Sequence, residues 1–402
     1  MVNVLNSIQF EDIEIENNKQ SHSEQPNEIV FQQNTELTLG VEIELQLIDK
    51  KSLNLSSKGE ELLKLSALNQ KIKQEFYLST VEVTTNICRS VQETEADLRQ
   101  SLLYIQDLGT ELDLRFATTG CHPFARYADC IISPTDRYYE LIDRNQWLTR
   151  RMTVYGLHVH LGMKSGDDCI RFNNFFMHLL PHLLALSSSS PFWQGDDTGL
   201  ASCRPTTYEA LPTAGQPYCV KNWREFENIY FTLKKCEAIK SLRDLWWDIR
   251  PSPAYGTLEI RVCDGLATLE ETLAIVAFIH GLALWFRDNG DWIDQVQLPA
   301  PWISRENKWR VIRYGLDAEI ITSSTGTLKP IRQDITDWIQ KISGHIISLG
   351  YEKYTLSLIK ILNMGTSSQR QRRVLQDTNS LKEVVLHNIH EFERGVANWP
   401  IC

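Results

Sequence analysis

A stretch that begins at Glu36 alternates apolar and polar side chains without interruption. Its apolar positions are Leu37, Leu39, Val41, Ile43, Leu45 and Leu47. Because successive side chains of a strand point to opposite faces, this stretch predicts a β-strand with one buried face. Shorter stretches of the same kind occur at residues 80–84, 156–162 and 256–262. The chain must therefore fold around a sheet that has one apolar and one polar face.

Helical periodicity fills most of the remaining chain. The clearest helix is predicted from Val91 to Leu112, where Ser90 and Glu93 form a capping box, and a second box at Thr268 begins an apolar helix through Phe286. Further helices are expected at residues 59–75, 168–186, 222–240, 304–318, 331–348, 352–363 and 380–396. Because the strands do not alternate regularly with helices, we expect an α+β fold with an antiparallel sheet.

Residues 1–34 differ in composition from the rest of the chain. They are rich in Asn, Gln, Ser and Glu, which predicts a polar tail that is wholly or partly disordered. No linker divides residues 35–402, so we expect one domain there. Within it, residues 187–217 form a long irregular stretch, which is either functional or a surface excursion.

The overall charge and the cysteines exclude several classes of protein. The chain has 41 Lys and Arg against 51 Asp and Glu, a net charge of −10, which does not favour nucleic acid or an anionic membrane as a partner. The nine cysteines form no C-x-x-C pair, so neither a disulfide framework nor a cysteine zinc site is expected. The apolar run from Leu273 to Phe286 is short for a membrane span and predicts a buried helix. Without a recognisable signal peptide, the expected location is the cytoplasm.

The polar faces of the four predicted strands carry an unusual set of side chains. Residues two apart share a face, and these faces hold three pairs and one single residue: Glu42 with Glu44, His158 with His160, Glu259 with Arg261, and Glu82. A solvated face would explain any one strand, but four such faces without lysine favour a functional site. If the strands are neighbours, the carboxylates repel one another and require cations. Carboxylates with imidazoles suit Mg²⁺ or Mn²⁺, the ions that position nucleoside triphosphates.

The sequence contains neither a G-x-x-x-x-G-K-[ST] loop nor a G-x-G-x-x-G motif. Any ATP would therefore be held by metal ions and by arginines. The candidates are Arg204, Arg250 and Arg261, since a guanidinium group forks onto phosphate or carboxylate oxygens.

Six segments together resemble the type 2 glutamate-cysteine ligase family, also called the carboxylate-amine ligases, of the glutamine synthetase-like superfamily. They are LGVEIELQL (39–47), GLHVHLG (156–162), SPFWQGDDTG (190–199), RPSP (250–253), GTLEIRV (256–262) and GTSSQRQ (365–371). The resemblance implies a curved antiparallel sheet with helices on its outer face, similar to the glutamine synthetase catalytic domain. It also implies a reaction: a carboxylate such as that of glutamate attacks ATP to give an acyl phosphate, and an amine such as that of cysteine displaces phosphate.

The same resemblance implies roles for individual residues. The implied metal ligands are Glu42, Glu44, Glu82, His158 and Glu259. His160 resembles a residue that contacts the nucleotide, and Arg250 and Arg261 are expected to bind the nucleotide and to stabilise the transferred phosphoryl group. Arg204 and Trp193 are expected to enclose the amino acid substrate.

Three other functions are compatible with part of this residue pattern. A metal-dependent hydrolase also uses His-x-His, but it would need further metal ligands that the sequence does not offer. A phosphotransferase of related architecture would stop at phosphate transfer, and a regulatory protein could retain a nucleotide pocket without catalysis. Residue patterns do not define the acid and the amine, and a homodimer is the commonest arrangement for a soluble enzyme.

Overall fold

The computed structural model describes residues 28–67, 69–291 and 300–397. Its central sheet has seven strands in the order β10-β11-β5-β1-β3-β2, with β4 also paired to β1, and every pair is antiparallel. The strands are β1 (Leu39–Asp49), β2 (Ile72–Gln74), β3 (Thr80–Thr84), β4 (Leu114–Ala117), β5 (Leu157–Gly162), β10 (Ile249–Ser252) and β11 (Thr257–Ile260). The predicted α+β class with an antiparallel sheet is confirmed.

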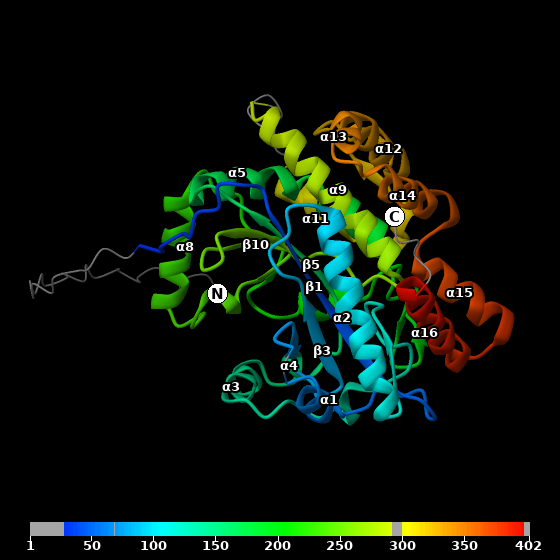
Figure 1. Ribbon diagram of the computed structural model, residues 1–402. Helices are drawn as coiled ribbons and strands as arrows, with labels where there is room; N and C mark the ends of the chain where they lie inside the picture. Colours follow the sequence, from blue (N-terminus) through cyan, green and yellow to red (C-terminus); the bar gives the residue numbers. More distant parts are fainter. Residues whose placement is uncertain (1–27, 68, 292–299, 398–402) are drawn as a thin grey trace, which may run out of the picture.

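Helices cover one face of this sheet. The helices that contact its strands include α2 (Val91–Glu111), α5 (Gly166–Met177), α9 (Leu269–Asp288) and α16 (Leu381–Ala397). In Figure 1, α2 crosses in front of β1 and β3. The apolar side chains of β1, among them Val41 and Ile43, are buried in the core that these helices complete. Within the described ranges, α9 is the one helix long and apolar enough to cross a membrane, but its residues are buried inside the protein.

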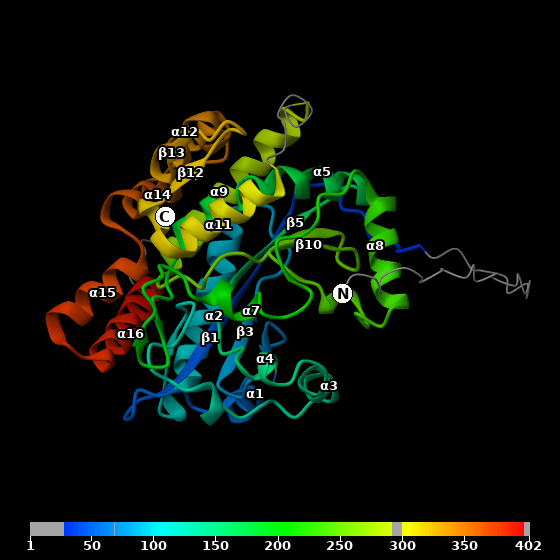
Figure 2. The same ribbon diagram turned by 180° about the vertical axis from the view of Figure 1, so that it is seen from behind.

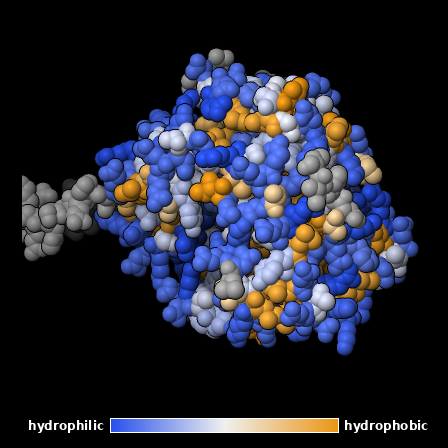
Figure 3. All heavy atoms as spheres, in the orientation of Figure 1, coloured by the Kyte–Doolittle hydropathy of each residue, from blue (hydrophilic) through white to orange (hydrophobic). Residues whose placement is uncertain are grey.

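The other helices surround this core or border the opposite face of the sheet. They are α1 (Gly59–Leu65), α3 (Asp136–Asn145), α4 (Trp147–Arg150), α6 (Leu180–Ser187), α7 (Arg204–Tyr208), α8 (Trp223–Lys235), α11 (Pro301–Tyr314), α12 (Ile331–Lys341), α13 (Ser343–Ser348), α14 (Glu352–Met364) and α15 (Ser367–Thr378). Figure 2 shows α7, which carries no label in Figure 1, and α3 and α4 can be followed in both views. The face shown in the space-filling view is mainly hydrophilic, with apolar residues in scattered groups (Figure 3).

Three short strand pairs and three single turns of 3₁₀ helix complete the fold. The pairs are β6 (Phe192–Trp193) with β7 (Asp196–Asp197), β8 (Ala214–Gly215) with β9 (Trp246–Trp247), and β12 (Glu319–Ile321) with β13 (Leu328–Pro330). The 3₁₀ turns cover Tyr127–Asp129, Leu242–Asp244 and Gly315–Asp317.

Several predicted elements differ from the structure. The helix expected over 59–75 ends at Leu65, and the chain then forms β2. The helix expected over 168–186 is interrupted between α5 and α6, where Pro181 lacks the N–H that a continuous helix needs. The irregular stretch 187–217 holds β6, β7, α7 and β8. Four of the described helices, α3, α4, α7 and α15, were not predicted from the sequence.

The expected polar tail falls partly outside the described residues, which begin at residue 28. Residues 29–34, by contrast, contact the folded body instead of extending from it. The amide of Asn34 donates to the carbonyl oxygen of Met163 over 2.9 Å, and the ring of Phe31 packs on Trp223. The apolar residues Ile29, Val30 and Phe31 depart from the polar composition on which the prediction of the tail depended.

Candidate active site

The register of the central strands brings the predicted polar residues together. Glu42 on β1 lies opposite His158 on β5, and His160 lies opposite Glu259 on β11. At one edge of this row, Arg250 on β10 is opposite Glu259, while at the other Glu44 is opposite Glu82 on β3. Strands from different parts of the sequence thus place one continuous charged surface on the polar face of the sheet.

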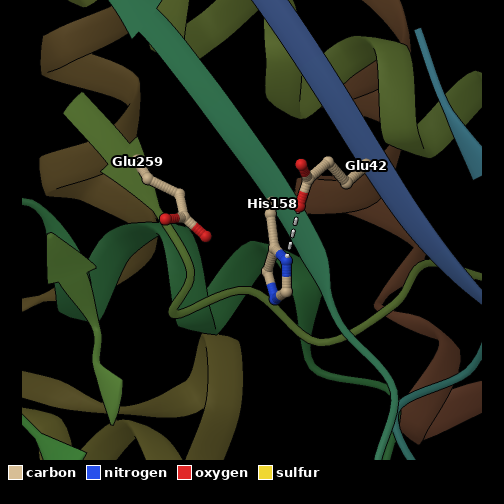
Figure 4. A group of neighbouring side chains, drawn as sticks. All are labelled: Glu42, His158 and Glu259. Atoms are coloured by element: carbon tan, nitrogen blue, oxygen red, sulfur yellow. Dashed lines mark hydrogen bonds and ion pairs between the residues drawn. The ribbon is translucent and has the colours of Figure 1, made fainter. Parts of the chain in front are cut away.

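Three of these residues form a compact group of possible metal ligands. Glu42, His158 and Glu259 each offer one ligand atom, and these atoms lie within 4.8 Å of one another. Figure 4 shows the carboxylates of Glu42 and Glu259 on two sides of the His158 ring. In the described chain, Nε2 of His158 is buried without a hydrogen-bond partner. Two carboxylates and an imidazole with a free nitrogen fit a divalent cation such as Mg²⁺ or Mn²⁺.

Glu42 is the centre of this group. Its Oε2 lies 3.3 Å from Nδ1 of His158, and its Oε1 lies 3.3 Å from Nε2 of His160. Burial alone would raise the pKa of Glu42, but hydrogen bonds from the two histidines hold that pKa well below its ordinary value. The carboxylate therefore stays ionised, as a metal ligand must.

Glu259 is ionised for a different reason. Its Oε2 accepts hydrogen bonds from Nη2 and Nε of Arg250 over 2.7 and 3.1 Å, and its Oε1 accepts one from Arg261. Burial opposes ionisation here too, yet the two positive charges lower the pKa of Glu259 far below its usual range. The site thus combines anionic ligands with guanidinium groups that can turn toward a phosphate.

Glu44 and Glu82 face the same groove but lie outside the compact group. The amide of Gly156 donates to Oε2 of Glu44 over 2.5 Å, and Nζ of Lys73 lies 3.6 Å from Oε1 of Glu82. The pKa of each carboxyl is raised, chiefly by burial, and Glu42 adds further repulsion. A cation bound nearby would relieve this crowding of negative charge.

All of these side chains line one groove, which has a volume of about 680 Å³. The turn between β10 and β11, Tyr138 of α3 and Tyr230 of α8 form its walls. A smaller cavity of about 80 Å³ shares Glu44, His158 and Arg261 with the groove. Its apolar and aromatic lining includes Met152, Val154, Tyr208, Trp246 and Trp247, of which Trp246 also lines the groove.

The two residues expected at the amino acid substrate are separated in the structure. Arg204 lines the smaller cavity, and its guanidinium group donates to the carbonyl oxygens of Arg261 and Val262 over 3.3 Å. Trp193 lines neither cavity. It pairs with Asp196 in the hairpin of β6 and β7, whose turn has positive φ at Gln194 and Gly195. The irregular stretch 187–217 thus brings Arg204, but not Trp193, to the site.

Not every residue of the groove was predicted from the sequence, and the carboxylate Glu75 is among those missed. Glu75, in the connection between β2 and β3, lines both the groove and the smaller cavity. Burial and the nearby charge of Glu44 raise the pKa of Glu75 to about 7. Glu75 was not predicted as a site residue because it lies in no recognisable motif. It was also assigned to the helix predicted over 59–75, and not to a strand with a polar face.

Comparisons with known proteins agree with this geometry. Residues 38–387 match the model of "Glutamate-cysteine ligase family 2(GCS2)". An inferred glutamate–cysteine ligase 2 of Bdellovibrio bacteriovorus is 42% identical over 372 residues, which are 92% of this chain and 98% of that protein. Its counterpart in Gloeobacter violaceus is 40% identical over 376 residues, covering 92% of this chain and 99% of that protein.

Two solved structures share the fold at low sequence identity. The glutamate–cysteine ligase of Francisella tularensis, solved in complex with AMP, superposes with a TM-score of 0.64 at 14% identity, over 93% of this chain and 97% of that chain. The bifunctional glutathione synthetase of Pasteurella multocida gives 0.61 at 13% identity, over 90% of this chain and 52% of that chain.

The charged groove and the family match together define an ATP-dependent ligase that joins a carboxylate to an amine. The chain belongs to the glutamate-cysteine ligase family 2. The resemblance found in its sequence motifs is thereby confirmed.

Proposed function

We propose that this protein activates the γ-carboxylate of glutamate as an acyl phosphate and couples it to the amine of cysteine, with release of ADP and phosphate. The observation that carries this proposal is the group of Glu42, His158 and Glu259, flanked by two arginines. Anionic ligands beside guanidinium groups suit a triphosphate whose terminal phosphoryl group is transferred.

The proposed metal site is built from Glu42, His158 and Glu259, with Glu44 and Glu82 as further ligands. The chemistry that Mg²⁺ or Mn²⁺ supplies when bound is neutralisation of phosphate charge. Arg250 and Arg261, now paired with Glu259, stabilise charge on the transferred phosphoryl group. His160, which lies between Glu42 and the β10–β11 turn, contacts the nucleotide.

The two halves of the reaction need different protein groups. Arg204, buried in the smaller cavity, offers a cation for the α-carboxylate of the acid. The incoming ammonium group must lose a proton before it can attack the acyl phosphate. Glu75 lies where both cavities meet and, with a pKa of about 7, can accept that proton near neutral pH.

The proposed fold is that of a glutamine synthetase-like catalytic domain. A polar sheet face that carries the charged groove, with helices on the other face, supports it. In this proposal residues 35–402 form the single catalytic domain and residues 1–34 precede it, although residues 29–34 already contact the domain. The enzyme works in the cytoplasm on small amino acid substrates, as a homodimer.

The test measures ADP formation from ATP and Mg²⁺ or Mn²⁺ with glutamate, in the presence of cysteine or hydroxylamine, with mass spectrometry of the products. We expect glutamate- and metal-dependent ADP release with formation of an amide or hydroxamate, abolished in a Glu42→Gln, Glu44→Gln double variant. If no carboxylate in a broad panel yields ADP although ATP binds, a regulatory nucleotide-binding protein replaces the ligase. If phosphate is transferred to an acceptor without amide formation, the protein is a phosphotransferase.

A further inference from the structure

Residues 29–34 form an irregular segment, named here the N-terminal strap, that lies outside the residues matched by the family model. Its first half is fixed on α8. The amide of Ile29 donates to Oε1 of the buried Glu227 over 2.7 Å. The ring of Phe31 meets the ring of Trp223 edge to face, with 5.3 Å between centroids and 80° between planes.

The second half of the strap holds the turn between β10 and β11. The amide of Gln32 donates to the carbonyl oxygen of Pro253 over 3.0 Å. The side chain of Asn34 donates to the carbonyl oxygens of Gly256 and Tyr255, over 2.7 and 3.0 Å. One side-chain amide thus binds two successive backbone carbonyls of the turn.

Gly256 shows how closely the strap approaches. Its φ is +64°, a conformation that favours glycine. A Cβ at this position would lie 1.7 Å from the carbonyl oxygen of Gln32 and 2.7 Å from Nδ2 of Asn34. Glycine is therefore required at position 256 for two reasons. The turn needs a positive φ there, and the close approach of the strap leaves no space for a Cβ.

The opposite side of the same turn faces the groove. Ser252, Pro253, Ala254 and Tyr255 line it. The ring of Tyr255 meets the ring of His160 edge to face, with 6.1 Å between centroids. His160 is in turn fixed by Oγ1 of Thr257 over 2.8 Å. A continuous series of contacts therefore joins Asn34, behind the turn, to His160 in the groove.

From these contacts we infer that Asn34 is a positioning residue for the nucleotide, because it sets the turn that forms the wall of the groove beside His160. The inference rests on the proposed function only in placing the nucleotide on this side of the groove. It assigns a role in substrate affinity to a segment outside the matched family span.

The test compares steady-state kinetics of Asn34→Ala and Asn34→Asp with the unaltered full-length protein. Loss of the two hydrogen bonds in Asn34→Ala should raise the KM for ATP on the order of fivefold. In Asn34→Asp the side chain keeps its size but presents a hydrogen-bond acceptor to two carbonyl oxygens. The KM for ATP should therefore rise at least as much as in Asn34→Ala. The KM for glutamate and kcat should stay within about twofold, since this account places neither the acid nor the reacting atoms at the turn.

Gln33→Ala is the matched control. Gln33 is the exposed neighbour of Asn34, and its side chain makes no hydrogen bond to the part of the chain that the structure describes. Gln33→Ala should leave kcat and the KM values for ATP and glutamate unchanged. An unchanged KM for ATP in both Asn34 variants would overturn the inference. A parallel change in kcat, in both KM values and in the melting temperature would also overturn it, since the strap would then serve stability alone.

A second measurement separates this inference from the proposed function. The Kd for Mg²⁺-ATP, measured by titration calorimetry, does not depend on turnover. If the unaltered protein forms no amide, the proposed function fails, but a weaker Kd in Asn34→Ala still supports the positioning role. If the unaltered protein is active and neither Kd nor KM for ATP responds to the variants, the positioning role alone fails.

Discussion

Glu42 on β1 and His158 on β5 face each other across the sheet, with 3.3 Å between Oε2 of the glutamate and Nδ1 of the histidine. The second oxygen of Glu42 reaches His160 at the same distance. One carboxylate thus joins the proposed metal ligands to the proposed nucleotide contact. Its removal should affect metal binding and turnover together.

Glu42→Gln keeps the size of the side chain and removes its charge. We expect kcat/KM to fall by at least about 100-fold, because an anionic ligand to the cation is lost. The rise in melting temperature caused by Mn²⁺ in the unaltered protein should also be lost, since a ligand stabilises only the state that binds it. Glu61→Gln, an exposed glutamate on α1, is the control. Full metal-dependent stabilisation in Glu42→Gln would contradict the assignment.

Glu75→Gln tests the proposed proton acceptor. Formation of the cysteine amide should fall by about 100-fold or more near neutral pH, because the ammonium group of cysteine has lost its base. Hydroxylamine is largely unprotonated under these conditions, so hydroxamate formation should fall much less. In the unaltered protein the rate with cysteine should rise as the pH passes through about 7, where Glu75 loses its proton. Equal losses with both amines would exclude a base role.

The carboxyl group of Glu75 should also make the stability of the protein depend on pH. Its pKa rises from 4.5 to about 7 on folding, so the folded protein holds this proton more tightly than the unfolded chain. The contribution of Glu75 to the free energy of unfolding is therefore present below pH 4.5 and declines as the pH rises toward 7. In metal-free urea denaturation, Glu75→Gln should lessen this decline. An identical pH profile in the variant would show that Glu75 titrates normally.

Gly156 leaves space for the side chains of Arg204 and His158 next to the charged surface. A Cβ there would lie 2.3 Å from Nη2 of Arg204 and 3.1 Å from Nε2 of His158. Gly156→Ala should therefore raise the KM for glutamate and lower the free energy of unfolding by about 1–3 kcal/mol. Gly344→Ala in α13, where a Cβ meets nothing within 4 Å, should instead be neutral or stabilising. An unaffected KM for glutamate in Gly156→Ala would argue against Arg204 as the carboxylate contact.

A buried ion pair supports the sheet behind the site. Lys308 contacts Asp248 and Glu209, and the carbonyl oxygen of Asp248 accepts a hydrogen bond from the amide of Arg261 over 2.7 Å. Lys308→Met leaves the buried carboxylate of Asp248 without its cation and should cost about 3–5 kcal/mol in urea denaturation. Lys240→Met breaks an exposed pair with Glu140 and should cost less than about 1 kcal/mol. Similar costs for the two variants would contradict this account.

The sequence predicted the strands of the site better than its loops. The strands β1, β3, β5 and β11 were recognisable because one face of each is apolar and the other carries Glu, His or Arg. Which strand lies beside which depends on pairings between distant segments, so the opposition of Glu42 and His158 required the structure. The groove residue Glu75 was not predicted, and the position of Trp193 apart from both cavities was not foreseen, for a related reason. Both residues lie in or beside short irregular connections, where tertiary contacts determine the position of a side chain. Such contacts leave no periodic pattern in the local sequence.

The most direct test of the central claim follows oxygen from the acid into phosphate. Glutamate labelled with ¹⁸O in both oxygens of its γ-carboxylate is incubated with ATP, Mg²⁺ and cysteine, and the inorganic phosphate is analysed by mass spectrometry. An acyl phosphate intermediate requires that each amide formed leaves one labelled oxygen in phosphate and one in the amide carbonyl. Amide formed with unlabelled phosphate would contradict the account, because the carboxylate would then not have been phosphorylated.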